Sequence, residues 1–179
     1  MATLIILWAQ MTLYNTDQYI LEPNNSYTNS NDGFGPINYT DEHTFVTVGS
    51  EDRNTQLRMP GGHDYSKPLP LVVALHGYGG SGQGNANYMH LFDSIHENEH
   101  LLLYPDGTQN FFGTRYWNAT NACCQFFGNT DDVRYLINLI DEAIQNYGAD
   151  PDGVVITGLS NGGFMSLSLI HISEPTRPY

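Results

Sequence analysis

Three runs of apolar residues recur along this chain, separated by more polar segments. The first is Pro68–Leu75, which ends at His76-Gly77, and the others are His100–Tyr104 and Gly153–Thr157. Continuous apolar runs of about 4–8 residues, bounded by turn residues, are typical of strands that are buried on both faces. Each run is therefore predicted to be a strand in the middle of a parallel sheet.

A different pattern precedes the first run. Residues Thr44–Gly49 and Asn54–Met59 alternate between apolar and polar side chains, and Glu51-Asp52 lies between the two segments. Alternation with a period of two indicates strands that have one buried face and one solvated face. We expect two edge strands, joined by a tight turn around Glu51-Asp52.

Helical spacing follows the first buried strand. Within Gln83–Glu97, apolar residues recur at intervals that would place them on one face of a single helix; they are Tyr88, Leu91, Phe92 and Ile95. We expect this helix to cover the sheet with that face.

A second helix is predicted before the last apolar run, with a stripe formed by Val133, Leu136, Ile137, Ile140, Ala143, Ile144 and Tyr147. Thr130 is expected to cap it, with Asp131 and Asp132 complementing the dipole of its first turn. Gly148 is expected to end it. The acidic pair is interpreted as helix-end electrostatics rather than catalysis. Strands that alternate with helices indicate one α/β domain, with a mostly parallel sheet and helices on both faces.

Charge narrows the range of partners. The 179 residues include 6 basic and 19 acidic residues, for a formal net charge of −13. This charge argues against nucleic acid and membrane as partners, because nucleic acid and anionic lipid are bound through clusters of Lys and Arg. No stretch reaches the ~20 apolar residues that span a bilayer. Residues 1–42 are predicted to be a poorly structured leader or linker, whose apolar start is either a partial secretion signal or sequence upstream of the domain.

The cysteines do not indicate a metal site. Cys123 and Cys124 are the only two, and they are adjacent in the sequence. They are interpreted as small buried hydrophobic residues or a vicinal pair, because no further ligands stand nearby at a suitable spacing. We expect neither a metal nor another cofactor.

The pattern Gly158-Leu159-Ser160-Asn161-Gly162 follows the third apolar run directly. A buried strand that stops at Gly-x-Ser-x-Gly is typical of a sharp turn into a helix, which exposes the serine hydroxyl in a strained backbone position. Side chains at the two glycine positions would collide with the neighbouring backbones. The pattern predicts Ser160 as a nucleophile for acyl transfer.

A second motif supplies what such a nucleophile requires. Attack on an ester places negative charge on the carbonyl oxygen, which backbone N–H groups must receive. One predicted donor is the amide of Asn161 at the start of the helix. The other is the amide of Tyr78 in the glycine-rich segment His76–Gly80, which follows a buried strand. The alternative for this segment is a merely flexible connection between strand and helix.

Six motifs together resemble the polyhydroxybutyrate depolymerase and feruloyl/acetylxylan esterase group of α/β-hydrolases. They are Pro70–Gly80, Tyr104–Gly107, Trp117–Ala119, Cys123-Cys124, Asp131–Val133 and Gly158–Gly163. The resemblance covers about residues 44–166 and implies an extracellular serine esterase that acts on polyester or on acyl groups of plant polysaccharide. It implies Ser160 as nucleophile, with Tyr78 and Asn161 as oxyanion donors. His76 and Trp117 are expected near the substrate cleft, and the alternative for Trp117 is an ordinary packing aromatic.

The catalytic machinery is expected to be incomplete. In this fold an acid and then a histidine follow the serine, but here His171 and Glu174 come in the reverse order, within or just behind the predicted helix. Residues 167–179 resemble the translation of an adapter used in sequencing libraries. We therefore expect a partial hydrolase domain at 43–166, truncated after the nucleophile, and a non-native tail at 167–179.

The sequence thus predicts the N-terminal part of a secreted carboxylic ester hydrolase that forms an acyl-enzyme on Ser160. The alternative from another class is a non-catalytic fragment or binding module. A peptidase or a dienelactone-type hydrolase would share the same serine turn. The sequence makes no prediction of the oligomeric state.

Overall fold

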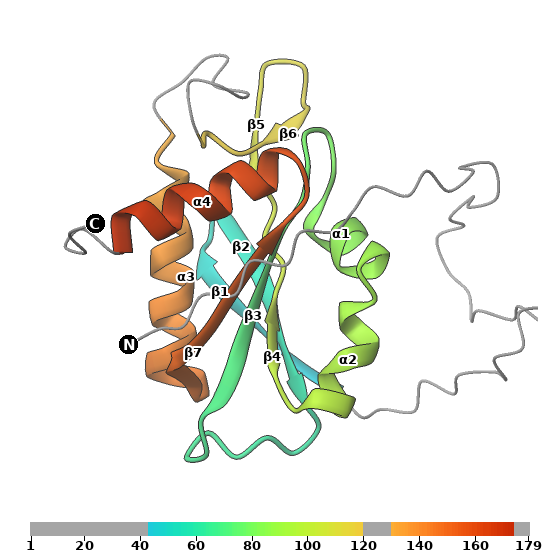
Figure 1. The fold of residues 1–179 in the computed structure, drawn as a ribbon, viewed down its shortest axis with the longest axis vertical. Helices are drawn as coiled ribbons and strands as arrows, with labels where there is room; N and C mark the ends of the chain where they lie inside the picture. Colours follow the sequence, from blue (N-terminus) through green and yellow to red (C-terminus); the bar gives the residue numbers. More distant parts are fainter. Residues whose placement is uncertain (1–42, 120–129, 174–179) are drawn as a thin grey trace, which may run out of the picture.

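A computed structural model of the chain describes residues 43–119 and 130–173, which are built around a mixed five-stranded sheet (Figure 1). Its strands, in spatial order, are β1 (His43–Ser50), β2 (Arg53–Pro60), β4 (Leu101–Leu103), β3 (Leu69–Leu75) and β7 (Ala149–Gly158). Strands β4, β3 and β7 run parallel to one another, whereas β1 pairs with β2, and β2 with β4, in antiparallel register. The three apolar runs thus form the parallel part of the sheet, as predicted.

The predictions about the sheet edges are wrong for two strands. β1 is an edge strand, but β2 has a neighbour on both sides, with Leu57 opposite Leu103 of β4. β7 is predicted in the middle, yet among the described residues it is the last strand of the sheet. The reason is that side chains point to the faces of a sheet while hydrogen bonds point to its edges. A hydrophobic pattern therefore reports buried faces and not neighbouring strands.

Helices cover both faces of the sheet, as predicted (Figure 1): α1 (Gly82–Tyr88) and α2 (Leu91–Asn98) on one face, α3 (Asp132–Tyr147) and α4 (Asn161–Ser173) on the other. Successive residues of β3 alternate between these two layers. Val73 belongs to the larger core under α3 and α4, and Ala74 to the smaller core under α1 and α2. Both side chains are fully buried, which explains why the run is continuously apolar.

The helix predicted over Gln83–Glu97 is divided in two. α1 begins after Ser81, whose hydroxyl accepts a hydrogen bond from the Gly84 amide, and it ends at Tyr88. His90 then adopts a left-handed φ of 54° before α2 starts. The break turns the predicted face: Ile95 is buried as expected, whereas Tyr88 is 72% exposed.

α3 starts one residue later than predicted. Asp131, and not Thr130, is its N-cap, because the Asp131 carboxylate accepts a hydrogen bond from the Arg134 amide. Asp132 lies in the first turn, and Gly148 ends the helix with a φ of 72°, as expected. Leu139, which the predicted stripe omits, is also buried in the core.

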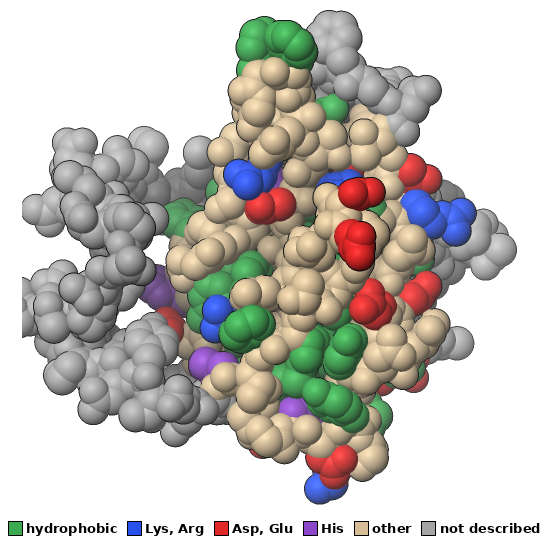
Figure 2. Space-filling model, turned by 180° about the vertical axis from the view of Figure 1, so that it is seen from behind, with side chains coloured by type: hydrophobic (Ala, Val, Ile, Leu, Met, Phe, Trp, Pro, Cys, Tyr) green, Lys and Arg blue, Asp and Glu red, His purple; other side chains and the backbone are tan. Residues whose placement is uncertain are grey.

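A short hairpin occupies the first part of the long loop that follows β4. β5 (Thr108–Gln109) and β6 (Arg115–Tyr116) pair antiparallel, and the Asn110 side chain accepts hydrogen bonds from the amides of Phe112 and Thr114. The rings at the tip of the hairpin are 98% exposed at Phe111 and 86% exposed at Phe112. Figure 2 shows hydrophobic side chains gathered at this upper end of the molecule.

Several predicted features lie outside the described residues. They are the leader at 1–42, Cys123-Cys124 in the long loop, and Glu174 near the end of the chain. Within the part of the chain that the structure describes, no helix is both long enough and apolar enough to cross a membrane.

Candidate active site

Ser160 lies in the sharp turn between β7 and α4, where the sequence pattern places it. Its φ of 51° is in the left-handed region, a conformation that costs a non-glycine residue about 1–3 kcal/mol. The flanking glycines make the turn possible: a Cβ on Gly158 would collide with the Gly162 carbonyl group, and one on Gly162 with the Leu75 carbonyl group. Ser160 is also exposed. The fold thus holds an exposed serine in a strained backbone.

The glycine-rich loop after β3 lies directly against this turn. A Cβ on Gly77 would stand 3.5 Å from the Ser160 Cβ and 3.3 Å from the carbonyl oxygen of Leu159. The Leu159 amide also donates to the carbonyl oxygen of Leu75, at 3.1 Å. The two motifs meet because β3 and β7 are neighbouring parallel strands, whose carboxyl ends lie at the same edge of the sheet.

The side chain of Asn161 is fully buried behind the serine. Its Oδ1 accepts a hydrogen bond from the Trp117 amide at 2.6 Å, and its Nδ2 donates to the Trp117 carbonyl oxygen at 3.0 Å. Trp117 is itself fully buried, and its indole N–H donates to the carbonyl oxygen of His76 at 2.9 Å. The indole therefore packs beneath the glycine-rich loop and joins it to the residue that follows Ser160.

His76 is held from both sides of its ring. Its Nε2 accepts a hydrogen bond from the Gly107 amide at 2.9 Å, so the proton of a neutral ring is on Nδ1, which donates to the Gly77 carbonyl oxygen at 2.7 Å. Burial lowers the pKa of His76 below its ordinary value of 6.5. A neutral imidazole with a hydrogen bond at each ring nitrogen therefore fixes the loop in place.

An ion pair with a buried carboxylate lies at the other end of this arrangement. Arg53 on β2 lies 2.6 Å from the carboxylate of Asp132, whose side chain is fully buried. The same carboxylate accepts a hydrogen bond from the Asn118 amide at 2.7 Å. Arg53 also stacks on the Tyr135 ring, 3.7 Å from its centroid. Bonds therefore run from β2 through Asn118 and its neighbour Trp117 to the turn at Ser160. We refer to Arg53, Trp117, Asp132 and Asn161 as the serine frame.

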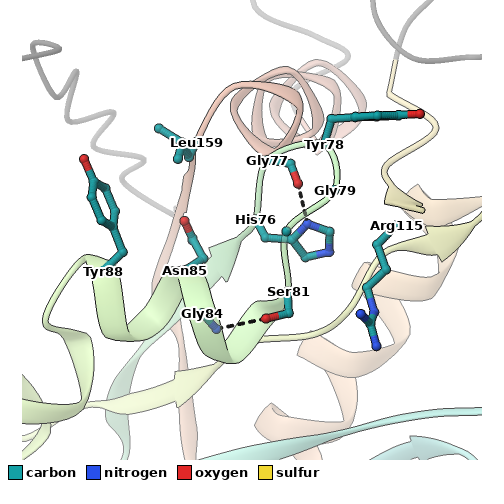
Figure 3. Close-up of a pocket in the computed structure, with 11 residues that line it drawn as sticks. His76, Gly77, Tyr78, Gly79, Ser81, Gly84, Asn85, Tyr88, Arg115 and Leu159 are labelled. Carbon is teal, nitrogen blue, oxygen red and sulfur yellow. Dashed lines mark hydrogen bonds between the residues drawn. The ribbon is translucent and has the colours of Figure 1, made fainter. Parts of the chain in front are cut away.

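A pocket of about 460 Å³ opens beside the glycine-rich loop (Figure 3). Its lining combines the loop, residues of α1, one residue of the serine turn and one residue of β6. The lining residues are His76, Gly77, Tyr78, Gly79, Gly80, Ser81, Gly84, Asn85, Tyr88, Arg115 and Leu159. Tyr78, a predicted oxyanion donor, is 47% exposed, and its hydroxyl accepts a hydrogen bond from Asn110. Of the two residues predicted near the cleft, His76 lines this pocket and Trp117 does not.

The described side chains give Ser160 no catalytic base. His63 contacts the Tyr147 carbonyl oxygen, His90 lies beside Asp93, and His100 lies beside Ser94. No hydrogen bond joins the Ser160 hydroxyl to any side chain within the described ranges. His171 belongs to α4. Within the same ranges, no group of three or more His, Cys, Asp or Glu residues could hold a metal ion.

Sequence reasoning missed three residues of this region. Arg53 directly precedes the alternating strand predicted at Asn54–Met59 and therefore reads as a solvated charge, yet it pairs with the buried carboxylate of Asp132. Asp132 reads as helix-end electrostatics, but its carboxylate is enclosed and bonded to Arg53 and Asn118. Asn85 is a polar residue of a predicted helix, although it is almost fully buried in the pocket wall. Only Asp132 gave a signal in the sequence. Its neighbour Asp131 is sufficient to cap α3, so a second acidic residue at this position calls for another role.

Comparisons with known proteins show which family the chain belongs to. The model of the Esterase family, described as "Putative esterase", matches residues 47–176. Feruloyl esterase B from Talaromyces funiculosus is 27% identical over 101 residues, which are 56% of this chain and 28% of that protein. Liver carboxylesterase 1 from Oryctolagus cuniculus is 33% identical over 111 residues, which are 61% of this chain and 19% of that protein.

Two solved structures show the fold. An acetyl xylan esterase from Aspergillus awamori is similar over 71% of this chain and 46% of its own, with a TM-score of 0.52 and 22% identity. A thermostable esterase is similar over 75% of this chain and 38% of its own, with a TM-score of 0.56 and 21% identity. The chain therefore spans less than half the length of these relatives. Its fold is part of an α/β-hydrolase fold, and by the family match it belongs to the Esterase family.

Proposed function

We propose that this protein is a carboxylic ester hydrolase that uses Ser160 as its nucleophile. The proposal depends on the backbone of Ser160, whose φ of 51° holds an exposed hydroxyl at a strand-to-helix turn beside a glycine-rich loop. α/β-Hydrolases use a strained serine in this position for acyl transfer. The family match and the names of the esterase relatives support the same chemistry.

In the proposed reaction, the oxygen of Ser160 forms a bond to the ester carbonyl carbon, and its proton passes to a general base. The carbonyl oxygen becomes an oxyanion, which accepts hydrogen bonds from the amides of Tyr78 and Asn161. The bond to the alcohol then breaks, and the alcohol leaves with the proton from the base. Water attacks the acyl-serine in the same way, which releases the carboxylic acid and restores the serine.

We further propose that the 179-residue chain is incomplete as a catalyst. The described residues lack a base or acid bonded to Ser160, so both would come from sequence outside these residues. The division into a leader at 1–42, a partial hydrolase domain at 43–166 and a non-native tail at 167–179 belongs to this proposal. α4 continues past Ser166 to Ser173 with Leu169 buried against the core, so this part of the tail would be helical whatever its origin. The same missing groups favour the second candidate function, a non-catalytic binding fragment.

The substrates proposed are feruloyl or acetyl esters of plant polysaccharide, or a polyester such as polyhydroxybutyrate. The names of the feruloyl esterase and acetyl xylan esterase relatives support the first two, and the sequence motifs support the third. Because plant polysaccharide lies outside the cell that degrades it, we propose that the protein is secreted. Its net charge of −13 makes nucleic acid and anionic membrane poor partners.

Hydrolysis of 4-nitrophenyl acetate by the product of the complete source gene tests the nucleophile. We expect Ser160→Ala to lower kcat/KM by about 10⁴-fold or more, because only binding and oxyanion stabilisation remain. The control is Ser94→Ala on α2, which removes a hydroxyl that bonds only within its own region and should keep the rate. Equal rates for the wild type and Ser160→Ala would overturn the proposal.

A fluorophosphonate probe tests the incompleteness separately. Such a probe labels a serine only when a base activates it. We expect Ser160 to be labelled in the product of the complete gene and not in the 179-residue chain. Equally fast labelling of both proteins would show that the shorter chain already holds its base.

A further inference from the structure

One side chain in the wall of the pocket beside the glycine-rich loop has a buried polar atom without a hydrogen-bond partner among the described residues. Asn85 on α1 is 6% exposed and lines the pocket. Among the residues that the structure describes, its Oδ1 accepts no hydrogen bond, and its Nδ2 donates to the Sδ of Met89, at 3.6 Å. In Figure 3, this side chain rises from α1 toward Leu159 of the serine turn.

Asn85 differs from the other polar side chains of the same wall. His76 is bonded at both ring nitrogens, the Ser81 hydroxyl accepts from the Gly84 amide, and Arg115 pairs with Asp106 at 3.0 Å. A buried acceptor without a partner destabilises a fold, so proteins keep few of them, and a ligand or water usually completes them. The orphaned oxygen therefore points to an occupant of the pocket.

The Asn85 amide is weakly held in the wall of a pocket of suitable size. Its terminal torsion is broad, and the contact that holds it is to sulfur, a weak acceptor. The contact to Met89 therefore does little to hold the amide in place. The volume of about 460 Å³ is within the range of about 300–1,000 Å³ that is usual for small-molecule sites.

The wall also restricts the chemistry of the occupant. An amide oxygen accepts hydrogen bonds only, so the group that meets it must be a donor. The Arg115–Asp106 pair leaves no excess negative charge in the wall to hold an ammonium group. Tyr78, Tyr88 and Leu159 offer apolar surface for a carbon skeleton. A neutral hydroxyl on an organic molecule meets all three conditions.

We propose that this pocket is a subsite for a hydroxyl group carried by the ester substrate, and that Asn85 selects for it through a hydrogen bond to Oδ1. The inference rests on the ester hydrolase function proposed above and narrows its substrates. Esters that carry a hydroxyl on the acyl or the alcohol part are preferred over analogues in which that oxygen is methylated.

Two substrate pairs test the inference in the product of the complete source gene. Methyl 4-hydroxycinnamate against methyl 4-methoxycinnamate places the hydroxyl on the acyl part, and 2-hydroxyethyl acetate against 2-methoxyethyl acetate places it on the alcohol. We expect the hydroxyl form of one pair to have a kcat/KM about 10–100-fold higher, since a buried polar group rejects an analogue that leaves it unpaired. The pair that shows the preference identifies the part of the ester that fills the pocket.

The variant Asn85→Leu should bring that ratio close to one. Asn87→Leu is the matched control, because Asn87 lies on the same helix, is exposed and does not line the pocket; it should keep the ratio. Each ratio is measured within one preparation, so a lower yield of folded protein leaves it unchanged. A ratio near one in the wild type for both pairs, or a preference that survives Asn85→Leu, would overturn the inference.

A binding measurement separates this inference from the proposed catalysis. Titration calorimetry of the 179-residue chain requires no turnover. The ligands are 4-hydroxycinnamamide against 4-methoxycinnamamide, and 2-hydroxyethyl acetate against 2-methoxyethyl acetate. Tighter binding of one hydroxyl form, lost in Asn85→Leu, would support the subsite even if no ester were hydrolysed. Equal binding within both pairs would overturn the subsite even in an active esterase.

Discussion

The serine frame and the pocket wall border the same turn, but they differ in how their polar groups are bonded. In the frame, the Asp132 carboxylate is bonded to Arg53 and Asn118, and the Asn161 amide is bonded at both ends. In the wall, Asn85 has an acceptor without a partner among the described residues, and Tyr88 is 72% exposed. Polar groups whose hydrogen bonds are all made hold their side chains in place, whereas a polar group without a partner remains available to a ligand. By this difference, the serine frame would orient Ser160, and the pocket wall would recognise a substrate.

The largest effect should follow from breaking the frame. Asp132→Ala removes the buried carboxylate of this ion pair and leaves the half-buried Arg53 without its partner. We expect the free energy of unfolding to fall by about 3 kcal/mol, the lower end of the usual cost of breaking a buried pair, because the Arg53 side chain is 22% exposed. Urea denaturation measures this change.

The neighbouring Asp131→Ala is the matched control. Asp131 is exposed and only caps α3, so its loss should cost about 1 kcal/mol. If the two variants lost equal stability, Asp132 would be no more than a second residue of the helix end, as its sequence position suggests.

The fold was largely predictable because hydrophobic patterns report buried faces. The two-sided burial of β3 and the helical stripe of α3 both follow from such patterns. Three features did not: the neighbour of β2, the position of β7 in the sheet, and the break at His90. Each depends on contacts between segments distant in the sequence or on one backbone torsion, and neither leaves a periodic signal.

The candidate site divides in the same way. Ser160 and the loop at Gly77 carry local signals, because glycines are required wherever backbones approach closely, and the structure brings them together. Arg53 and Asn85 carry none, since a charged or polar residue on a strand or helix usually faces solvent, and Asp132 carries only the weak signal of standing beside the residue that caps α3. Their roles come from partners that only the tertiary structure provides.

Acid should weaken the structure through its buried histidines, one of which fixes the glycine-rich loop next to the frame. Burial lowers the pKa of His76 and of His100 below the ordinary value of 6.5. Below about pH 6.5 the unfolded chain therefore binds protons that the folded chain does not, and this favours unfolding. The stabilisation is complete above this pH and is lost as the pH falls toward the lower pKa of the folded state. The free energy of unfolding should fall by up to about 1.4 kcal/mol per pH unit for each histidine.

Denaturation curves between about pH 7.5 and 5 measure this slope. His100→Gln removes one of the two titrating rings and leaves the loop at His76 intact. The slope of the unfolding free energy against pH should therefore become shallower by the contribution of one histidine. An unchanged slope would mean that His100 does not contribute to the acid sensitivity.

The smallest effect is expected in the pocket wall. Tyr88→Ala removes a ring that is 72% exposed, so the free energy of unfolding should change by less than about 0.5 kcal/mol. The matched variant Tyr116→Ala removes a ring that is 1% exposed, and it should cost about 3–5 kcal/mol, as buried aromatic rings do. Thermal or urea denaturation compares the two. A loss above about 1 kcal/mol in Tyr88→Ala would show that the ring packs against the fold. The wall would then be part of the rigid structure, and the contrast with the frame would rest on Asn85 alone.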